Sequence, residues 1–180
     1  MARIASVTPA AAGTRTGNRH TAQRWATLLR SLGHRVAVAV EWNGERCDTL
    51  IALHARRSHP SVVRYRAEHP AGPLVVVLTG TDLYRDLPAS REARHSLRLA
   101  DRIIVLQSEA RFELGKPLQA KTRIVYQSAD SSLRHAPPGD RFRIAVVGHL
   151  REEKDPFRAV MALSLLQEIR NLEVKQVGDA

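Results

Sequence analysis

The chain has 180 residues, 43% of them hydrophobic, and its 28 basic against 18 acidic residues give a net charge of +10. This hydrophobic content excludes a mainly disordered protein, and the longest apolar runs, such as Leu74–Leu78, are too short to span a bilayer. A single cysteine, Cys47, excludes an internal disulfide and a cysteine-rich zinc site. No signal-peptide pattern precedes Thr14, so we expect a soluble, cytoplasmic protein without a membrane span.

The positive charge comes mostly from arginines that are spread from Arg3 to Arg170. A nucleic-acid site needs basic residues clustered on one face, ideally interleaved with aromatic side chains, which make up only 4% of this chain. We therefore expect no nucleic-acid partner. Small anionic substrates account for the charge excess at least as well.

Apolar runs rich in β-branched residues predict strands at 3–7, 35–40, 49–53, 73–78, 102–106, 123–126, 143–147 and 173–177. Most runs are nearly continuous, which is typical of strands covered on both faces. Helical patterns separate many of them, so the sequence predicts an α/β fold with a mostly parallel sheet and right-handed crossovers. Two runs begin alike, with Arg3-Ile4-Ala5 and Arg143-Ile144-Ala145, which indicates two α/β domains.

The first predicted helix has an apolar stripe at helical spacing, formed by Ala22, Trp25, Ala26, Leu29 and Leu32. Gly33 follows in a C-cap position. Asp155-Pro156 favours the start of another helix, because a capping side chain precedes a proline at the first helical position. Segments 58–69 and 89–99 have weaker helical patterns.

The polar stretch 128–140, which contains Pro137-Pro138-Gly139, is predicted to be an interdomain linker. Residues 1–127 then form one domain of about six strands. Residues 141–180 supply only a strand, a helix and a strand, which cannot bury both faces of their own sheet. We therefore expect a complete first domain followed by the beginning of a second, truncated one.

In a parallel α/β sheet, ligands bind beyond the carboxyl ends of the strands, where this chain carries small polar residues and arginines. The loop with Gly13, Thr14, Asn18 and Arg19 precedes a helix whose free N–H groups favour an anion, although a mere connecting turn is the alternative.

Two further loops at this edge carry candidates. Arg56 and Arg57 could clamp an oxyanion, or be solvated at a helix start. After the fourth run come Thr81 and Asp82, and Asp82 either orients a substrate hydroxyl or caps the next helix.

The segment 148–156 joins a strand end to a predicted helix start and carries Gly148, His149, Arg151 and Lys154, a local design suited to a diphosphate. An exposed charged loop is the alternative, because two glutamates dilute the positive field. The histidines show no metal-ligand spacing, so we expect no metal. A G-x-S-x-G motif is absent from the sequence.

Three segments are similar to known sequence motifs. Leu78-Thr-Gly-Thr-Asp82 is similar to a His-Gly-Thr-Asp segment, and Ala100–Val105 to an ADxxxxVS strand. Val147–Leu150 with Lys154 is similar to a VGRLxxxKG domain start. Through them the chain resembles the retaining-type glycosyltransferases of the two-Rossmann-domain (GT-B) architecture. That resemblance implies a complete N-terminal Rossmann-like domain and the first β-α-β of a C-terminal nucleotide-sugar domain. It also implies that the carboxylate pair that holds the donor lies beyond residue 180.

A narrower resemblance rests on Gly17-Asn18-Arg19, Leu53–Ser58, Leu78–Leu87 and Gly148–Pro156. Here the chain is similar to the selenosugar synthases of selenoneine biosynthesis. These enzymes form a C–Se bond between selenophosphate and the sugar of a UDP donor, such as UDP-N-acetylglucosamine or UDP-glucose.

The narrower resemblance implies two binding regions and no cofactor. Selenophosphate would be bound in the first domain by Gly13, Thr14, Asn18, Arg19, Arg56, Arg57 and Thr81. The donor diphosphate would be bound in the second by Gly148, His149, Arg151 and Lys154.

The chain departs from the common glycosyltransferase pattern at Thr79, His149 and Asp155, where His, Arg and Gly are usual, and at Gln127-Ser128 in place of Asn-Gly. These changes argue against an ordinary member and are consistent with an unusual anionic acceptor. Two alternatives stay open: an ordinary GT-B glycosyltransferase with a hydroxyl acceptor, for which Asp82 is the first candidate base, and a truncated, non-catalytic domain that binds phosphate compounds.

Overall fold

The computed structural model describes residues 1–129, 139–150 and 154–178, and the chain divides into two compact units, residues 1–129 and 130–180. The strands of the first unit are β1 (Arg3–Val7), β2 (Arg35–Ala39), β3 (Thr49–Leu53), β4 (Leu74–Leu78), β5 (Arg102–Val105) and β6 (Thr122–Ile124). Its α-helices are α1 (Gly17–Ser31), α2 (His59–Glu68), α3 (Leu87–Ala89), α4 (Arg91–Leu99) and α5 (Lys116–Ala120). A π-helical turn, Asp82–Asp86, and a 3₁₀ turn, Glu109–Arg111, complete it.

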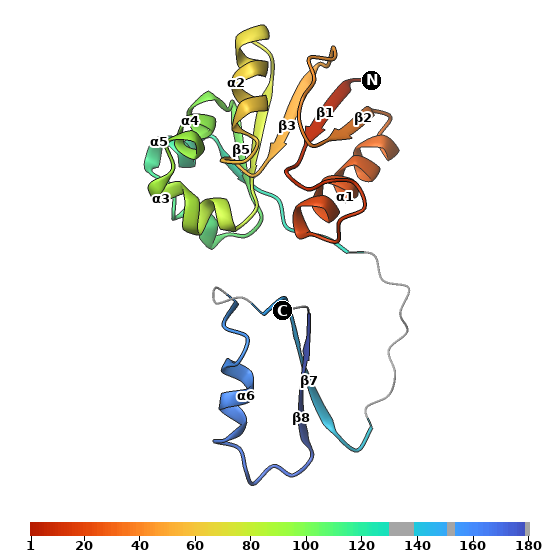
Figure 1. The fold of residues 1–180 in the computed structure, drawn as a ribbon, viewed down its shortest axis with the longest axis vertical. Coiled ribbons are helices and arrows are strands. Elements are labelled where there is room, and N and C mark those ends of the chain that lie inside the picture. The colour runs from red at the N-terminus through yellow and green to blue at the C-terminus, as the bar shows by residue number, and fades with distance from the viewer. Residues whose placement is uncertain (130–138, 151–153, 179–180) are drawn as a thin grey trace. The chain divides into compact units, whose positions relative to one another are not determined.

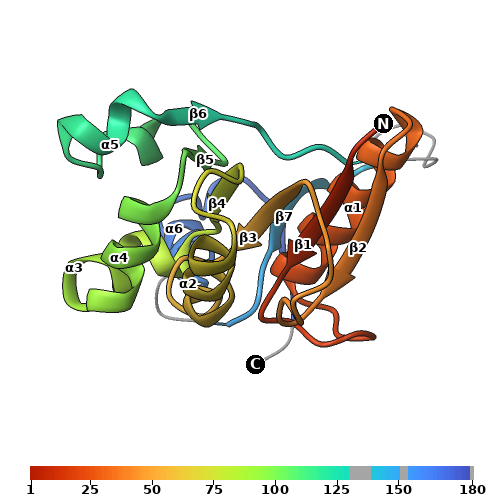
Figure 2. The same cartoon turned by 90° about the horizontal axis from the view of Figure 1, so that it is seen from above.

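The six strands form one sheet in the order β2-β1-β3-β4-β5-β6, and every neighbouring pair is parallel. From β1 the chain crosses to β2 on one side, and from β3 it crosses to β4 on the other. With right-handed crossovers, α1 and α2 therefore lie on opposite faces, as Figures 1 and 2 show. The predicted α/β class and parallel sheet are confirmed, and the arrangement is consistent with a Rossmann-like fold.

The central strands are buried on both faces, which explains their nearly continuous apolar sequences. On the α2 and α4 face, Val62, Tyr65 and Leu97 pack with strand residues such as Leu50. Each fully buried side chain of this size contributes about 1.5–3 kcal/mol relative to exposure. The α1 face holds smaller clusters, including one of Ile4, Ala26 and Val36.

Helix α1 ends as the sequence predicts. Gly33 has φ of +86°, a left-handed conformation that glycine adopts without steric penalty. Its N–H donates to the carbonyl of Arg30 at 2.9 Å, and the next N–H donates to Leu29 at 3.1 Å. These bonds satisfy carbonyls of the last turn and direct the chain into β2.

At the amino edge of the sheet, Arg66 of α2 ties several loops together. Its guanidinium donates to Asp101 Oδ2 at 2.8 Å, and that carboxylate oxygen also accepts the N–H of Leu74 at 2.8 Å. The same side chain donates to backbone carbonyls of four residues: His69, Pro70, Gly72 and Leu99. This network joins the end of α2 and the end of α4 to the starts of β4 and β5.

The second unit contains β7 (Phe142–Val147), α6 (Arg158–Leu163) and β8 (Leu172–Val177), and its two strands are parallel. The expected helix start at Asp155-Pro156 is wrong. Helix α6 begins at Arg158 with Phe157 at its N-cap, and Asp155 has φ of +44° instead of the extended backbone typical of an N-cap; its carboxylate pairs with Arg158. Large apolar side chains such as Met161 and Leu165 are exposed in this unit. Most of the predicted linker, 130–138, lies outside the described residues.

Candidate ligand site at the carboxyl edge of the sheet

Strand order defines where a ligand site is expected. The chain leaves β1 and β3 in opposite directions, so the loops after these two adjacent strands diverge at the carboxyl edge. Open α/β sheets bind ligands at such a switch point. The loop before α1 follows β1, and the segment with Arg56 and Arg57 follows β3, so two predicted anion-binding segments share one edge of the sheet.

The loop before α1 presents backbone N–H groups. Thr16 stands at the N-cap, but its side chain caps no N–H group, and the first turn contains no acidic residue. Positive partial charge at this helix end is therefore not neutralised locally. Gly13 has φ of +82°, and the Thr14 hydroxyl donates to the Ala11 carbonyl at 2.8 Å, which stabilises the turn.

Two side chains of the first turn of α1, those of Asn18 and Arg19, are half-buried. Arg19 Nε is buried and lacks a hydrogen-bond partner in the described part of the chain. An anion at this helix end would have a guanidinium within the same turn.

Asp82 is fully buried, at 0% exposure, and holds two loops together. Its Oδ2 accepts the N–H of Ala55 at 2.8 Å, and its Oδ1 accepts the N–H of Thr79 at 2.8 Å. Both carboxylate oxygens therefore have backbone donors, and neither reaches solvent. This geometry is that of a residue that positions the β3 and β4 loops, rather than of a base or of a cap on the following helix.

His54 is a site residue that the sequence analysis missed. It directly follows β3, is 1% exposed, and has φ of +73°, a conformation that few non-glycine residues adopt. Its Nδ1 accepts the N–H of Arg57 at 3.3 Å, so the ring proton sits on Nε2, which lies 3.4 Å from Thr81 Oγ1.

The pKa of His54 is lowered, chiefly by burial and also by Arg57 and Arg56, against the opposing effect of Asp82 and Asp86. The imidazole is therefore neutral near pH 7. Because its Nδ1 already accepts a backbone N–H, this ring orients its neighbours and does not serve as a proton acceptor.

Arg56 is paired with a buried carboxylate. Its Nε lies 3.0 Å from Asp86 Oδ2, and the Asp86 side chain is only 6% exposed. Arg56 itself is 45% exposed, so its outer N–H groups remain open to solvent. Arg57 is exposed as well, and Thr81 is half-buried beside His54. The structure thus brings Arg56, Arg57, Thr81 and Asp82 together at one place.

In the second unit, Gly148 closes β7 against β8. Its N–H donates to the Val177 carbonyl, and its own carbonyl accepts from Gln176 Nε2, both at 2.8 Å. Gly178 packs so closely here that a Cβ would lie 2.0 Å from the Gly148 oxygen. His149 and Lys154 are exposed, and Arg151 lies outside the described residues.

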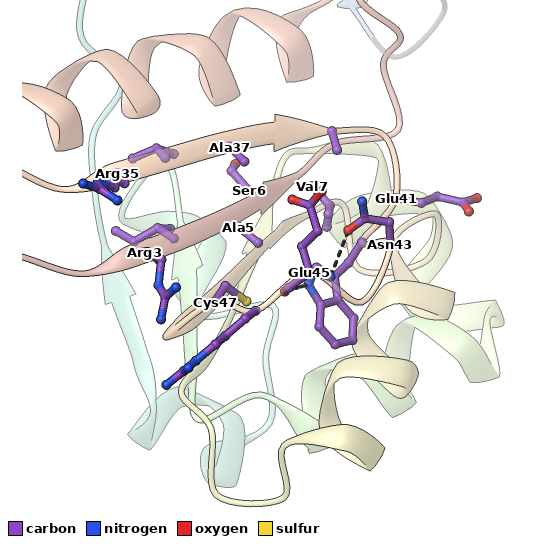
Figure 3. A pocket seen from close by; sticks show the side chains of 15 residues that line it. Arg3, Ala5, Ser6, Val7, Arg35, Ala37, Glu41, Asn43, Glu45 and Cys47 are labelled. Carbon is purple, nitrogen blue, oxygen red and sulfur yellow. Dashed lines mark hydrogen bonds between the residues drawn. The ribbon is translucent and has the colours of Figure 1, made fainter.

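A pocket of about 310 Å³ is lined by β1, β2 and the loop that follows β2, and none of the candidate site residues above lines it (Figure 3). Ala5, Ala37 and Cys47 are among the residues that line it, with Glu41 and Glu45 in the loop beyond β2. Burial is the main cause that raises the pKa of the Cys47 thiol, so the thiolate that would be reactive is disfavoured. We assign no chemistry to this cavity.

Among the described residues, no group of three or more His, Cys, Asp or Glu side chains is arranged to hold a metal ion. No helix in the same part of the chain is long and apolar enough to cross a membrane. No family model matches the sequence, and no curated protein is significantly similar to it.

Proposed function

We propose that the protein is a selenosugar synthase of the GT-B glycosyltransferase type. It transfers a sugar from a UDP-sugar to the selenium of selenophosphate. The observation that carries this proposal is the shared edge at the switch point: the uncapped N-terminus of α1 and the segment with Arg56 and Arg57 follow the adjacent strands β1 and β3. Helix N-termini and arginines are the groups that bind phosphate-like anions.

The acceptor chemistry agrees with the side chains at this edge. A hydroxyl acceptor needs a base to remove its proton, but Asp82 and His54 both accept backbone N–H groups and are buried. Selenophosphate brings an anionic selenium that needs no base. In the proposed step the C–Se bond forms while the C–O bond to the diphosphate breaks, and UDP leaves with the electron pair.

The donor side of the proposal relies on the second unit. Gly148, His149, Arg151 and Lys154 would hold the diphosphate, as the family resemblance implies. Lys154 is exposed and carries a positive charge suited to the negative charge that develops on the leaving group. Neither a metal nor a cofactor is invoked.

The test uses the protein expressed together with any residues that follow Ala180 in its reading frame. UDP-N-acetylglucosamine or UDP-glucose is supplied with selenophosphate, and UDP release is followed by chromatography. We expect release only when selenophosphate is present. Equal release with hydroxyl acceptors would indicate an ordinary glycosyltransferase, and no release with any acceptor would indicate a binding domain.

A substitution at Lys154 tests whether this residue holds the donor diphosphate, provided that the variant still folds. Lys154→Ala should abolish turnover while the melting temperature stays unchanged, because this side chain is exposed. The matched control is Lys116→Ala, another exposed lysine, located at the start of α5. Unchanged turnover in Lys154→Ala would refute the donor assignment.

A further inference from the structure

Two arginines from different loops meet at one carboxylate. Arg56, in the loop after β3, places its Nε 3.0 Å from Asp86 Oδ2. Arg85, in the π-helical turn after β4, places its Nε 3.5 Å from Asp86 Oδ1. Since β3 and β4 are adjacent and parallel, both guanidiniums lie at the carboxyl edge described above.

The contacts with Asp86 leave most N–H donors of Arg56 and Arg85 unused. Both arginines approach Asp86 through Nε, and their outer nitrogens have no other partner in the described part of the chain. Their side chains are 45% and 62% exposed, whereas that of Asp86 is buried. A guanidinium held through Nε keeps N–H groups available for a tetrahedral oxyanion.

The cluster is positively charged and so favours an anion, and its carboxylate offsets the repulsion between the two guanidiniums. Arg56 and Arg85 carry two positive charges and Asp86 one negative charge, while burial lowers the pKa of His54 and keeps it neutral beside them. Without the carboxylate, the two guanidiniums would repel each other. Arg57 and the buried Asp82 also lie near His54, and their opposite charges offset each other, so the group as a whole keeps a net charge of about +1.

Asp86 has the hydrogen-bonding pattern of an incomplete site rather than of a finished structural pair. Its Oδ2 is buried and lies beside Arg56 Nε, but no donor reaches it with hydrogen-bond geometry. His54 Nε2 lies 3.8 Å away, beyond hydrogen-bond distance.

We infer that Arg56 and Arg85, gathered by Asp86, form a two-arginine receptor for a tetrahedral oxyanion such as a phosphate or phosphate analogue. This inference rests on the proposed function for its location at the acceptor edge. It adds Arg85 as a binding residue and Asp86 as a positioning residue; both stand within the Leu78–Leu87 segment, to which the sequence analysis gave no role for either side chain.

The direction in which Asp86→Asn changes anion affinity shows whether Asp86 positions the two arginines or competes with the anion for them. Asp86→Asn removes a negative charge near the anion, so affinity would rise if Asp86 only competed with the ligand for Arg56. If Asp86 positions both guanidiniums, affinity falls because they separate. We expect the affinity for anions to fall about fivefold to tenfold in Asp86→Asn.

The experiment measures binding of inorganic phosphate and of thiophosphate to the full chain by titration calorimetry, with no sugar donor present. Arg85→Ala should weaken both about tenfold, and Arg85→Lys should weaken them less. Arg91→Ala, an exposed arginine at the start of α4, is the matched control and should bind like the parent. Each variant is first checked for an unchanged melting temperature.

The outcomes distinguish this inference from the proposed function. Unchanged phosphate affinity in Arg85→Ala, or higher affinity in Asp86→Asn, would overturn the receptor even if the protein makes a selenosugar. Tenfold weaker binding in Arg85→Ala supports the receptor even if no sugar is transferred. Should Asp86→Asn fail to fold, Arg85→Ala and Arg85→Lys decide the matter alone.

Discussion

The sheet of the first unit carries an arginine–aspartate pair at each of its edges, and the two pairs differ in how completely they are satisfied. At the amino edge, Arg66 donates to four backbone carbonyls as well as to Asp101. Its side chain is 16% exposed. At the carboxyl edge, Arg56 makes one close contact, with Asp86, and nearly half of its side chain is exposed.

Residue type alone therefore does not distinguish an ion pair whose cation is fully bonded from one whose cation is open to solvent. In the Arg66 pair the cation is the less exposed partner, at 16% against 50% for the carboxylate, and backbone carbonyls accept the remaining guanidinium donors. In the Arg56 pair the carboxylate is buried and the cation faces solvent, so its charge acts outward. Breaking the first should affect folding, and breaking the second should affect binding.

The largest expected effect is on stability at the amino edge. Arg66→Ala removes several hydrogen bonds to carbonyls of the α2 and α4 ends, and we expect the free energy of unfolding to fall by about 3 kcal/mol. Urea denaturation measures this change. Phosphate affinity, measured on the folded variant, should stay the same, and a tenfold loss there would erase the distinction between the edges.

The reverse pattern is expected at the carboxyl edge. Arg56→Gln removes the charge and leaves a shorter polar side chain, so phosphate affinity should fall about thirtyfold. The free energy of unfolding should fall by only about 1 kcal/mol, because Arg85 still neighbours Asp86. Calorimetry and urea denaturation on one preparation give both values. A larger loss of stability than of binding would mean that the two pairs play the same role.

Much of the scaffold was predictable from sequence because it depends on local chemistry. All the strands of the first unit begin and end within about two residues of the predicted runs. Gly33 caps α1 as predicted, since left-handed backbone at a helix end favours glycine. Parallel topology follows from the alternation of strands and helices, so the edge with Arg56 and Arg57 could be foreseen.

The fine structure of the site could not be predicted, because it is made by contacts between distant segments. Asp82 bonds to Ala55, and His54 is left-handed although it is not glycine. Nothing local to Arg85 or Asp86 indicates that Arg56 will join them. The wrong start of α6 has a similar origin, since Asp155 has the sequence of a cap but not its backbone conformation.

Acidification should weaken the two edges over different pH ranges. Burial lowers the pKa of His54, so the unfolded chain takes up its proton first and stability is lost as pH falls below about 6.5. At the other edge burial raises the pKa of Asp101, but hydrogen bonds from Arg66 and Leu74 outweigh this and the net pKa is lowered. That contribution is lost only below about pH 4.

The pH prediction is checked by urea denaturation between pH 7 and pH 5. One group contributes at most about 1.4 kcal/mol per pH unit. His54→Asn should reduce the slope, because asparagine tolerates the left-handed backbone but does not titrate in this range. His59→Gln is the control for the other histidine whose pKa is lowered, mainly by burial. An unchanged slope in His54→Asn would show that its burial is not retained in solution.

The smallest effect is expected from a pair that is exposed on both sides. Arg64 and Glu68 of α2 are four residues apart, with Nε and Oε1 at 2.8 Å, and both side chains lie open to water. Solvent screening limits such a pair, so Glu68→Gln should lower the free energy of unfolding by about 0.5 kcal/mol or less, and 0.5 M salt should abolish the difference. Phosphate affinity should not change. A short distance is therefore insufficient for either role: we expect Arg66 to stabilise the fold because most of its donors are bonded, and Arg56 to bind phosphate because a buried carboxylate lies beside its Nε while its outer donors face solvent.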